Sequence, residues 1–136
     1  MIRFEDRFVD VGGRRTRYWS GAAAAQAAPP LVLLHGIGCS VTEWGPTLQG
    51  LGAQRRVIAL DMLGFGAPDK PADESYSIAN LARFVLDFAT ALGFDRMHLG
   101  GNSLGGRVAL ECALIEPARV ESLVLADPAG VGREAF

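Results

Sequence analysis

The 136-residue sequence predicts an α/β fold, with a mostly parallel, doubly wound sheet of about six strands and an N-terminal antiparallel hairpin. Three observations predict it. Short, unbroken apolar runs recur along the chain, as in strands that are buried on both faces. Segments with a helical spacing of apolar residues fall between these runs, which is the order that a parallel sheet needs. A glycine pair between two β-like runs near the N-terminus indicates the hairpin.

The predicted strands start with that hairpin. Residues 3–11 alternate loosely between apolar and polar side chains, Gly12-Gly13 gives the turn, and residues 14–19 form the second arm. Residues 21–30 are interpreted as a surface connection, because a glycine opens this alanine-rich stretch and two prolines close it. Buried strands are expected at residues 31–34, 57–60, 97–99 and 123–126.

The clearest predicted helix covers residues 77–92, where apolar side chains recur at helical spacing and form one stripe. Ser77 is a candidate N-cap, and Gly93 follows at a position where a left-handed residue often ends a helix. A second helix is expected over residues 104–116, because a proline follows it. A weaker helical segment covers residues 42–50.

Length and composition indicate one domain, residues 1–136, with a filled core. Hydrophobic residues make up 49% and charged residues 21% of the chain, which is too apolar for wholesale disorder. The formal net charge is −2 and no basic run occurs, so nucleic acid is not expected as a partner. No apolar run approaches the roughly 20 residues that span a membrane, so no membrane partner is expected either.

The two cysteines, Cys39 and Cys112, lie far apart in the sequence, and neither belongs to a CxxC pair. We therefore expect no disulfide framework and no zinc site, and a reducing compartment fits this cysteine usage better. Charged residues interrupt the N-terminus at once, so it does not have the apolar region of a signal peptide. The expected location is the cytoplasm.

The most informative stretch is Gly101-Asn102-Ser103-Leu104-Gly105, a G-x-S-x-G pattern between a predicted strand and a predicted helix. This is the setting of a nucleophile elbow, in which a sharp turn exposes the serine hydroxyl at the carboxyl edge of the sheet. Bulky side chains two positions away would collide, so glycine suits both flanks. The plainer interpretation is an ordinary flexible loop between strand and helix. A dinucleotide or phosphate loop is not indicated, because neither G-x-G-x-x-G nor GxxxxGK[ST] occurs.

A second glycine-rich loop, His35-Gly36-Ile37-Gly38, directly follows a predicted buried strand. Acyl transfer needs two backbone N–H groups aimed at the oxyanion. We expect one from Leu104, just after the candidate nucleophile, and the other from Ile37. Two functions remain open for His35. It could be the catalytic base, or it could brace the loop, which is the interpretation that we favour.

These motifs resemble those of the α/β-hydrolase superfamily. The sequence HGIG at residues 35–38 is similar to the family's oxyanion loop, and GNSLGG at residues 101–106 is similar to its elbow. Residues 61–66 and 125–130 resemble the turn after the fourth strand and the exit from the sixth, and all four motifs occur in the family's order. Asn102 before the nucleophile is similar to C–C bond hydrolases that cleave vinylogous diketones, and also to esterases. A serine as nucleophile argues against the branches that use aspartate there.

The resemblance implies parts that the sequence does not contain. In this family the order along the chain is serine, then an acid, then histidine. Both histidines, His35 and His98, precede Ser103, and we expect His98 to pack sideways in the sheet. Asp127 occupies a position that some members use for the acid, although it is structural in most. The chain therefore resembles the N-terminal half of a complete member, with its domain incomplete at the C-terminus.

The resemblance implies a serine-nucleophile hydrolase for an ester, a thioester or an activated C–C bond. The substrate would be a small acyl or diketone-type molecule, and no cofactor or metal is implied. This chain alone is expected to be inactive, because it lacks the catalytic histidine. The alternative is a non-catalytic half-domain that pairs with itself or with a partner, since residues 120–126 would form an exposed apolar edge. A third interpretation keeps residual activity with His35 as the base.

Overall fold

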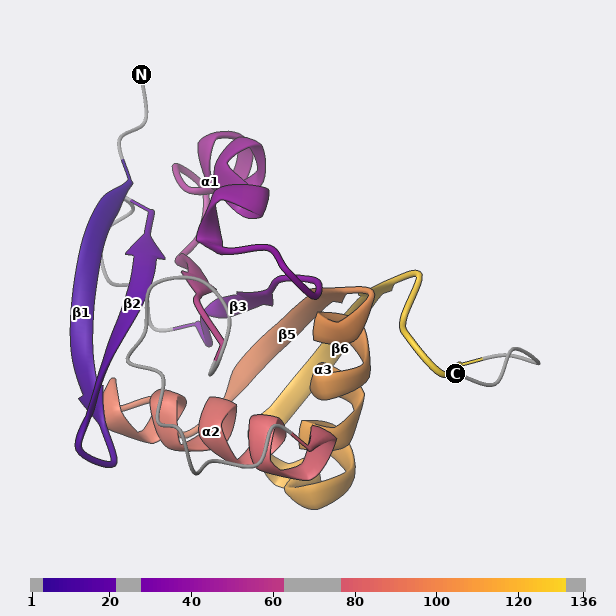
Figure 1. Ribbon diagram of the computed structural model, residues 1–136. Coiled ribbons are helices and arrows are strands. Elements are labelled where there is room, and N and C mark those ends of the chain that lie inside the picture. Colours follow the sequence, from indigo (N-terminus) through magenta and orange to yellow (C-terminus); the bar gives the residue numbers. More distant parts are fainter. Residues whose placement is uncertain (1–3, 22–27, 63–76, 132–136) are drawn as a thin grey trace.

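The computed structural model describes residues 4–21, 28–62 and 77–131, and it contains a six-stranded mixed sheet (Figure 1). The strand order is β1-β2-β4-β3-β5-β6. The first two pairs in this order are antiparallel, and the other three are parallel. The strands are β1 (Glu5–Val11), β2 (Arg14–Ser20), β3 (Leu31–Leu34), β4 (Val57–Leu60), β5 (Met97–Asn102) and β6 (Val120–Ala126).

Helices cover both faces of the sheet, as the doubly wound prediction requires. The helical elements are η1 (Val41–Trp44), α1 (Gly45–Leu51), α2 (Ile78–Ala91), α3 (Leu104–Ile115) and η2 (Pro117–Arg119). Successive side chains of a strand point to opposite faces. Leu31 and Leu33 accordingly pack with Leu48 of α1, whereas Val32 and Leu34 pack with α2 and α3. Figure 1 shows α2 and α3 together, with α1 apart from them.

The structure confirms the predicted hairpin, the strands at 31–34, 57–60, 97–99 and 123–126 and the two main helices, but the strand at 123–126 is exposed rather than buried, because it lies at the edge of the described sheet. The Ser77 hydroxyl caps α2 by accepting a hydrogen bond from the backbone N–H of Asn80 at 3.1 Å. Gly93 follows this helix with φ 80°, in the left-handed region that glycine tolerates best. Of the predicted connection at residues 21–30, residues 22–27 lie outside the described part of the chain.

Some elements differ in extent from the prediction. The strand predicted at 123–126 begins at Val120. The weak helix predicted at residues 42–50 is a 3₁₀ turn, η1, followed by the short helix α1. Pro46 lies in the first turn of α1, where its missing N–H costs nothing. The predicted strand at 97–99 continues to Asn102, because Gly100, Gly101 and Asn102 pair with β6.

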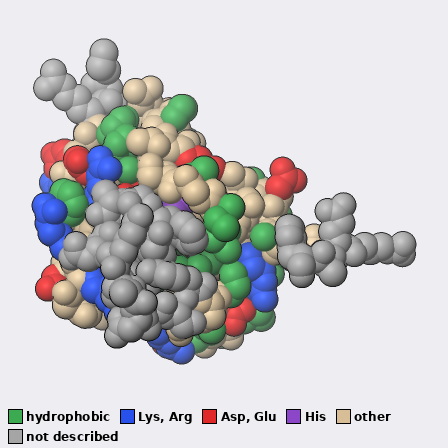
Figure 2. Space-filling model, in the orientation of Figure 1, with side chains coloured by type: hydrophobic (Ala, Val, Ile, Leu, Met, Phe, Trp, Pro, Cys, Tyr) green, Lys and Arg blue, Asp and Glu red, His purple; other side chains and the backbone are tan. Residues whose placement is uncertain are grey.

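Strand β6 is the edge of the described sheet, and its side chains are more exposed than those of β3 and β4. Val124 is 63% and Leu125 is 36% exposed. In the described part of the chain, no helix is long and apolar enough to span a membrane. On the face in Figure 2, basic side chains are interspersed with acidic ones rather than gathered into one patch.

Candidate active site

Ser103 occupies a sharp turn between β5 and α3. Its backbone has φ 54° and ψ −115°, a conformation that non-glycine residues rarely adopt. Hydrogen bonds on both sides hold it there. The Ser103 N–H donates to the carbonyl of Ala126 at 2.9 Å, and its own carbonyl accepts from the N–H groups of Arg107 at 3.1 Å and Ala129 at 3.0 Å. The surrounding backbone thus imposes the strained turn.

Glycine is required on either side of Ser103, because any side chain there would clash with neighbouring backbone. A Cβ on Gly105 would lie 2.1 Å from the carbonyl oxygen of Leu34, at the end of β3. A Cβ on Gly101 would overlap the backbone of Gly105 in the same way. The close approach therefore packs the first turn of α3 directly against the end of β3.

That packing brings the glycine-rich loop after β3 beside the elbow. A Cβ on Gly36 would lie 3.7 Å from the Cβ of Ser103. The loop turns tightly, since the N–H of Cys39 donates to the carbonyl of Gly36 at 3.2 Å. Gly38 has φ 73°, which a type II turn requires at its third position. The structure therefore brings together the two loops that the sequence predicted to be partners.

His35 is buried beneath this loop, and both of its ring nitrogens have partners. Nε2 accepts a hydrogen bond from the N–H of Met62 at 3.0 Å, which places the ring proton on Nδ1. Nδ1 lies 2.7 Å from the carbonyl oxygen of Gly36 and therefore donates to it. The carbonyl of Gly36 consequently receives two hydrogen bonds, from His35 and from Cys39.

These two hydrogen bonds also orient the N–H of Ile37. The peptide between Gly36 and Ile37 is trans, so its C=O and N–H point in opposite directions. Because the carbonyl of Gly36 is held by His35 and Cys39, the N–H of Ile37 points away from them. The Ile37 side chain is 70% exposed, at the outer surface of the turn.

Glu43 is a site residue that the sequence reasoning missed. One of its carboxylate oxygens accepts from the N–H of Gly36 at 2.9 Å, and the other accepts from Nδ2 of Asn102 at 2.5 Å. The carboxylate thus links the loop after β3 to the elbow. Glu43 and Asn102 are 59 positions apart in the chain, so no local pattern relates them. The one available signal was an acidic residue in the turn that follows the glycine loop.

Of the motif at residues 61–66, the structure describes Asp61 and Met62, and residues 63–66 lie outside the described part of the chain. The Asp61 side chain is fully buried. Asp61 Oδ1 accepts a hydrogen bond from the N–H of Val41 at 2.7 Å. This contact fixes the start of η1, which carries Glu43. The carboxylate therefore has a structural part in the site.

Of the other predicted candidates, His98 lies away from the serine, whereas Asp127 lies between two residues, Ala126 and Ala129, whose backbones are hydrogen-bonded to that of Ser103. His98 Nδ1 is 2.7 Å from the hydroxyl oxygen of Ser122 on β6, so the ring lies across the sheet, as predicted. His98 precedes Ser103 by five positions along the strand, or about 16 Å at strand rise. Asp127 follows β6 directly, is exposed and has φ 42°.

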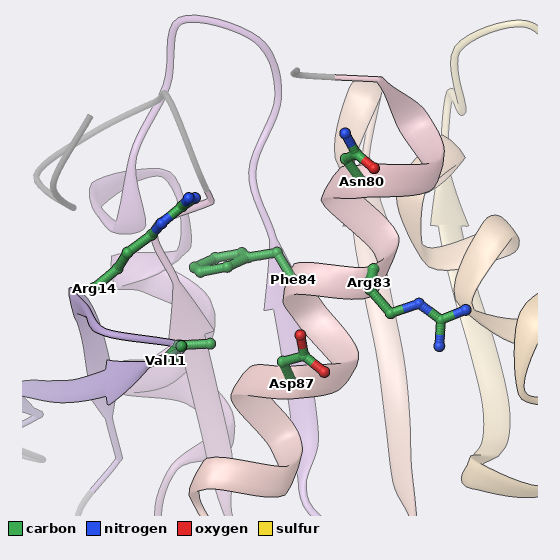
Figure 3. A pocket seen from close by; sticks show the side chains of 7 residues that line it. Val11, Arg14, Asn80, Arg83, Phe84 and Asp87 are labelled. Carbon is green, nitrogen blue, oxygen red and sulfur yellow. The ribbon is translucent and has the colours of Figure 1, made fainter. Parts of the chain in front are cut away.

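A separate pocket lies between the β1–β2 turn and α2 (Figure 3). Phe84 extends from α2 toward Val11 and Arg14 there. No residue of the elbow or of the glycine loop lines this pocket. Beside the glycine loop, a shallower depression is lined by Gly38, Cys39, Ser40, Thr42 and Glu43. Among the described residues, no cluster of His, Cys, Asp and Glu side chains could hold a metal ion.

With this geometry in place, comparison with known proteins identifies the family. The model of the alpha/beta hydrolase fold family matches residues 29–135. The chain belongs to the α/β-hydrolase family. As an α/β-hydrolase, it matches curated relatives such as the two below over most of its own length but over less than half of theirs.

Two curated relatives and one solved structure illustrate this. The chain is 38% identical over 124 residues to the dihydrolipoyllysine-residue acetyltransferase component of an acetoin cleaving system from Pseudomonas putida, covering 91% of this chain and 33% of the relative. It is 37% identical over 132 residues to 2-hydroxy-6-oxo-6-(2'-aminophenyl)hexa-2,4-dienoic acid hydrolase from Metapseudomonas resinovorans, covering 94% and 44%. A crystal structure of a bacterial membrane phospholipase A matches with a TM-score of 0.90 at 35% identity, covering 98% of this chain and 42% of that one.

Proposed function

We propose that this α/β-hydrolase chain carries the nucleophile and the oxyanion hole of a serine hydrolase for an ester, a thioester or an activated C–C bond. Ser103 is the nucleophile, and the backbone N–H groups of Ile37 and Leu104 bind the oxyanion. The observation that carries the proposal is the strained turn at Ser103, with the Gly36 loop packed beside it. Such strain persists only where the surroundings enforce it, and it is typical of reactive positions.

The chemistry follows from these positions. The Ser103 hydroxyl attacks the substrate carbonyl carbon while its proton passes to a base, and the carbonyl π electrons move onto the oxygen. Leu104 is the first residue of α3, so its N–H is one of the four that a helix leaves without an internal partner. The oxyanion would accept hydrogen bonds from this N–H and from that of Ile37. The positive end of the α3 dipole adds to the stabilisation.

The class of substrate is supported by the relatives. The hydrolase from Metapseudomonas resinovorans is named for a 2-hydroxy-6-oxo-dienoic acid, a molecule with no ester or amide. Hydrolysis of such a molecule breaks a C–C bond next to its ketone. Asn102 before the serine, on the resemblance described above, supports both this class and esters. Small molecules of the two classes are therefore the substrates to assay.

The catalytic base is proposed to lie outside these 136 residues. No histidine follows Ser103 in the sequence, and both nitrogens of His35 are engaged by backbone groups. His35 is thus proposed to brace the loop together with Gly36 and Gly38. On this basis the chain by itself is inactive and gains activity when a segment that supplies a histidine and an acid is present. Two free cysteines support a reducing location, the cytoplasm.

The test compares this chain alone, and the same chain extended by the downstream coding sequence, on p-nitrophenyl acetate and on a 2-hydroxy-6-oxo-dienoate. We expect turnover only by the extended form, and its loss in Ser103→Ala. Equal turnover by Ser103→Ala and the wild type would overturn the assignment of Ser103 as the nucleophile. Turnover by the 136-residue chain that depends on His35 would instead make His35 the base.

A second function, self-association without catalysis, is favoured by the exposed apolar side chains of β6. Val124 is 63% exposed on an edge strand, where unpaired backbone groups can pair with another copy. Size-exclusion chromatography with light scattering tests this. A dimer of the 136-residue chain that dissociates in Val124→Lys supports it, and a monomer at all concentrations removes it.

A further inference from the structure

We propose that Glu43 is a positioning residue that locks the oxyanion loop onto the nucleophile elbow and occupies the N–H of Gly36, so that the N–H of Ile37 binds the oxyanion. This inference rests on the proposed function of Ser103. It begins with two hydrogen bonds that one carboxylate accepts, from the N–H of Gly36 at 2.9 Å and from Nδ2 of Asn102 at 2.5 Å. The carboxylate joins a loop that follows β3 to the last residue of β5.

The contact with Gly36 decides which N–H faces the oxyanion. Of the two glycines in this loop, Gly36 lies closer to the serine, with its Cβ position 3.7 Å from the Cβ of Ser103. Its N–H would otherwise compete for the substrate oxygen. Because Glu43 accepts this N–H, it is withdrawn from the substrate oxygen, and the next N–H along the loop is that of Ile37. Among the described residues, the N–H of Ile37 makes no hydrogen bond.

The contact with Asn102 fixes the other half of the site. Asn102 directly precedes Ser103 and ends β5. An amide N–H held by a charged acceptor forms a shorter and stronger hydrogen bond than one held by a neutral group. The Asn102 side chain is therefore held toward the loop, and the distance between the two oxyanion donors is set by one carboxylate.

Hydrogen bonds also fix the backbone of the turn that carries Glu43. The turn η1 that carries it is capped by the Ser40 hydroxyl, which accepts from the N–H of Thr42 at 3.3 Å. The buried carboxylate of Asp61 accepts from the N–H of Val41 at 2.7 Å. The backbone on the N-terminal side of Glu43 is thus anchored to the end of β4. A carboxylate placed this way holds the loop without depending on substrate.

The first test uses the active form of the protein. Loss of an oxyanion donor costs about 10²–10³-fold in kcat, so we expect misplacement in Glu43→Ala to lower kcat by about 10–100-fold. KM should change less than about threefold, since the effect belongs to the transition state. Glu43→Gln should restore kcat to within about threefold of wild type, because its amide oxygen accepts from Gly36 while a flipped Asn102 amide accepts its N–H. Glu121→Ala, which removes a carboxylate that pairs with Arg96 on the surface, away from the glycine loop, is the matched control.

The second test does not depend on activity. Hydrogen exchange of the Gly36 amide should accelerate in Glu43→Ala, recover in Glu43→Gln and stay unchanged in Glu121→Ala. Unchanged kcat in Glu43→Ala, when Ser103→Ala is inactive, would overturn the positioning role and leave the proposed function intact. Full activity of Ser103→Ala would overturn both. A fall in kcat that Glu43→Gln fails to restore, together with unchanged amide exchange, would also overturn the lock.

Discussion

A Cβ added to Gly101 would lie 2.3 Å from the backbone carbonyl carbon of Gly105, a distance that no real Cβ contact reaches. The two glycines flank Ser103, one in β5 and the other in α3. Their contact lets the chain reverse from strand to helix within a few residues. The conformation of the elbow therefore depends on close packing between backbone segments as well as on the strained backbone of Ser103.

Gly101→Ala should destabilise the protein by at least about 3 kcal/mol, because the clash is with backbone that cannot move aside. The matched control is Gly50→Ala in α1, where a Cβ meets no atom within 4 Å and φ is not positive. There we expect a gain of about 0.5–1 kcal/mol, since alanine loses less backbone entropy in a helix. Urea unfolding monitored by circular dichroism measures both. Equal stability of the two variants would contradict the close contact.

Ser103→Gly should be more stable than Ser103→Ala. Alanine keeps the positive φ of 54° and its strain, whereas glycine adopts this backbone freely. The released strain exceeds the extra entropy of the unfolded glycine chain, so we expect a difference of about 1 kcal/mol. Thermal unfolding of the two variants, compared with Ala109→Gly in the middle of α3, measures it. A less stable Ser103→Gly would mean that the turn is not strained.

Arg119→Met should be costly because this guanidinium binds backbone carbonyls of helix α2 and of the segment that follows it. It donates to the carbonyl oxygens of Phe94 at 2.8 Å, Asp95 at 3.2 Å and Leu86 at 3.3 Å. Losing these charged hydrogen bonds should destabilise the protein by about 2–3 kcal/mol. Arg96→Met is the control. Its exposed pair with Glu121 should contribute less than about 1 kcal/mol. Similar losses in the two variants, measured by urea unfolding, would refute this assignment.

The buried thiol of Cys112 should make stability fall in alkaline solution. Burial raises the pKa of this thiol from 9.0 to about 12 in the folded protein. Above pH 9 the unfolded chain loses the thiol proton and the folded chain keeps it, so the unfolded state is favoured. We expect this group to lower the unfolding free energy by about 1.4 kcal/mol per pH unit between pH 9 and 12. Cys112→Ala should remove that slope and Cys39→Ala, at an exposed thiol, should keep it. Identical slopes in both variants would contradict the raised pKa.

Local patterns were sufficient to predict most of the fold. The continuous apolar runs identified β3 and β4, because strands covered on both faces carry no polar alternation. The G-x-S-x-G spacing identified the elbow glycines, because the requirement for small residues acts within a few positions of Ser103. The 3₁₀ turn before α1 was missed, although Pro46 in the first helical turn was its signal.

Contacts between distant segments could not be predicted in the same way. The strand β5 is longer than expected, since Gly100 and Gly101 have low strand propensity and are held there by pairing with Val124 and Leu125. The bridge from Glu43 to Asn102 depends on the order of strands in the sheet. The sequence around either residue carries no information on that order.

Strands β3 and β5 pair in parallel, with Leu34 opposite Gly101, and the site depends on this register. A slip of one residue would turn every side chain of β5 to the opposite face. It would also move Gly105 away from the end of β3, where its Cβ position lies 2.1 Å from the carbonyl oxygen of Leu34. A misaligned chain could thus retain helices and much of its sheet while Ser103 loses its turn. Reactivity of Ser103 with a covalent serine probe would then report the fraction of molecules in correct register.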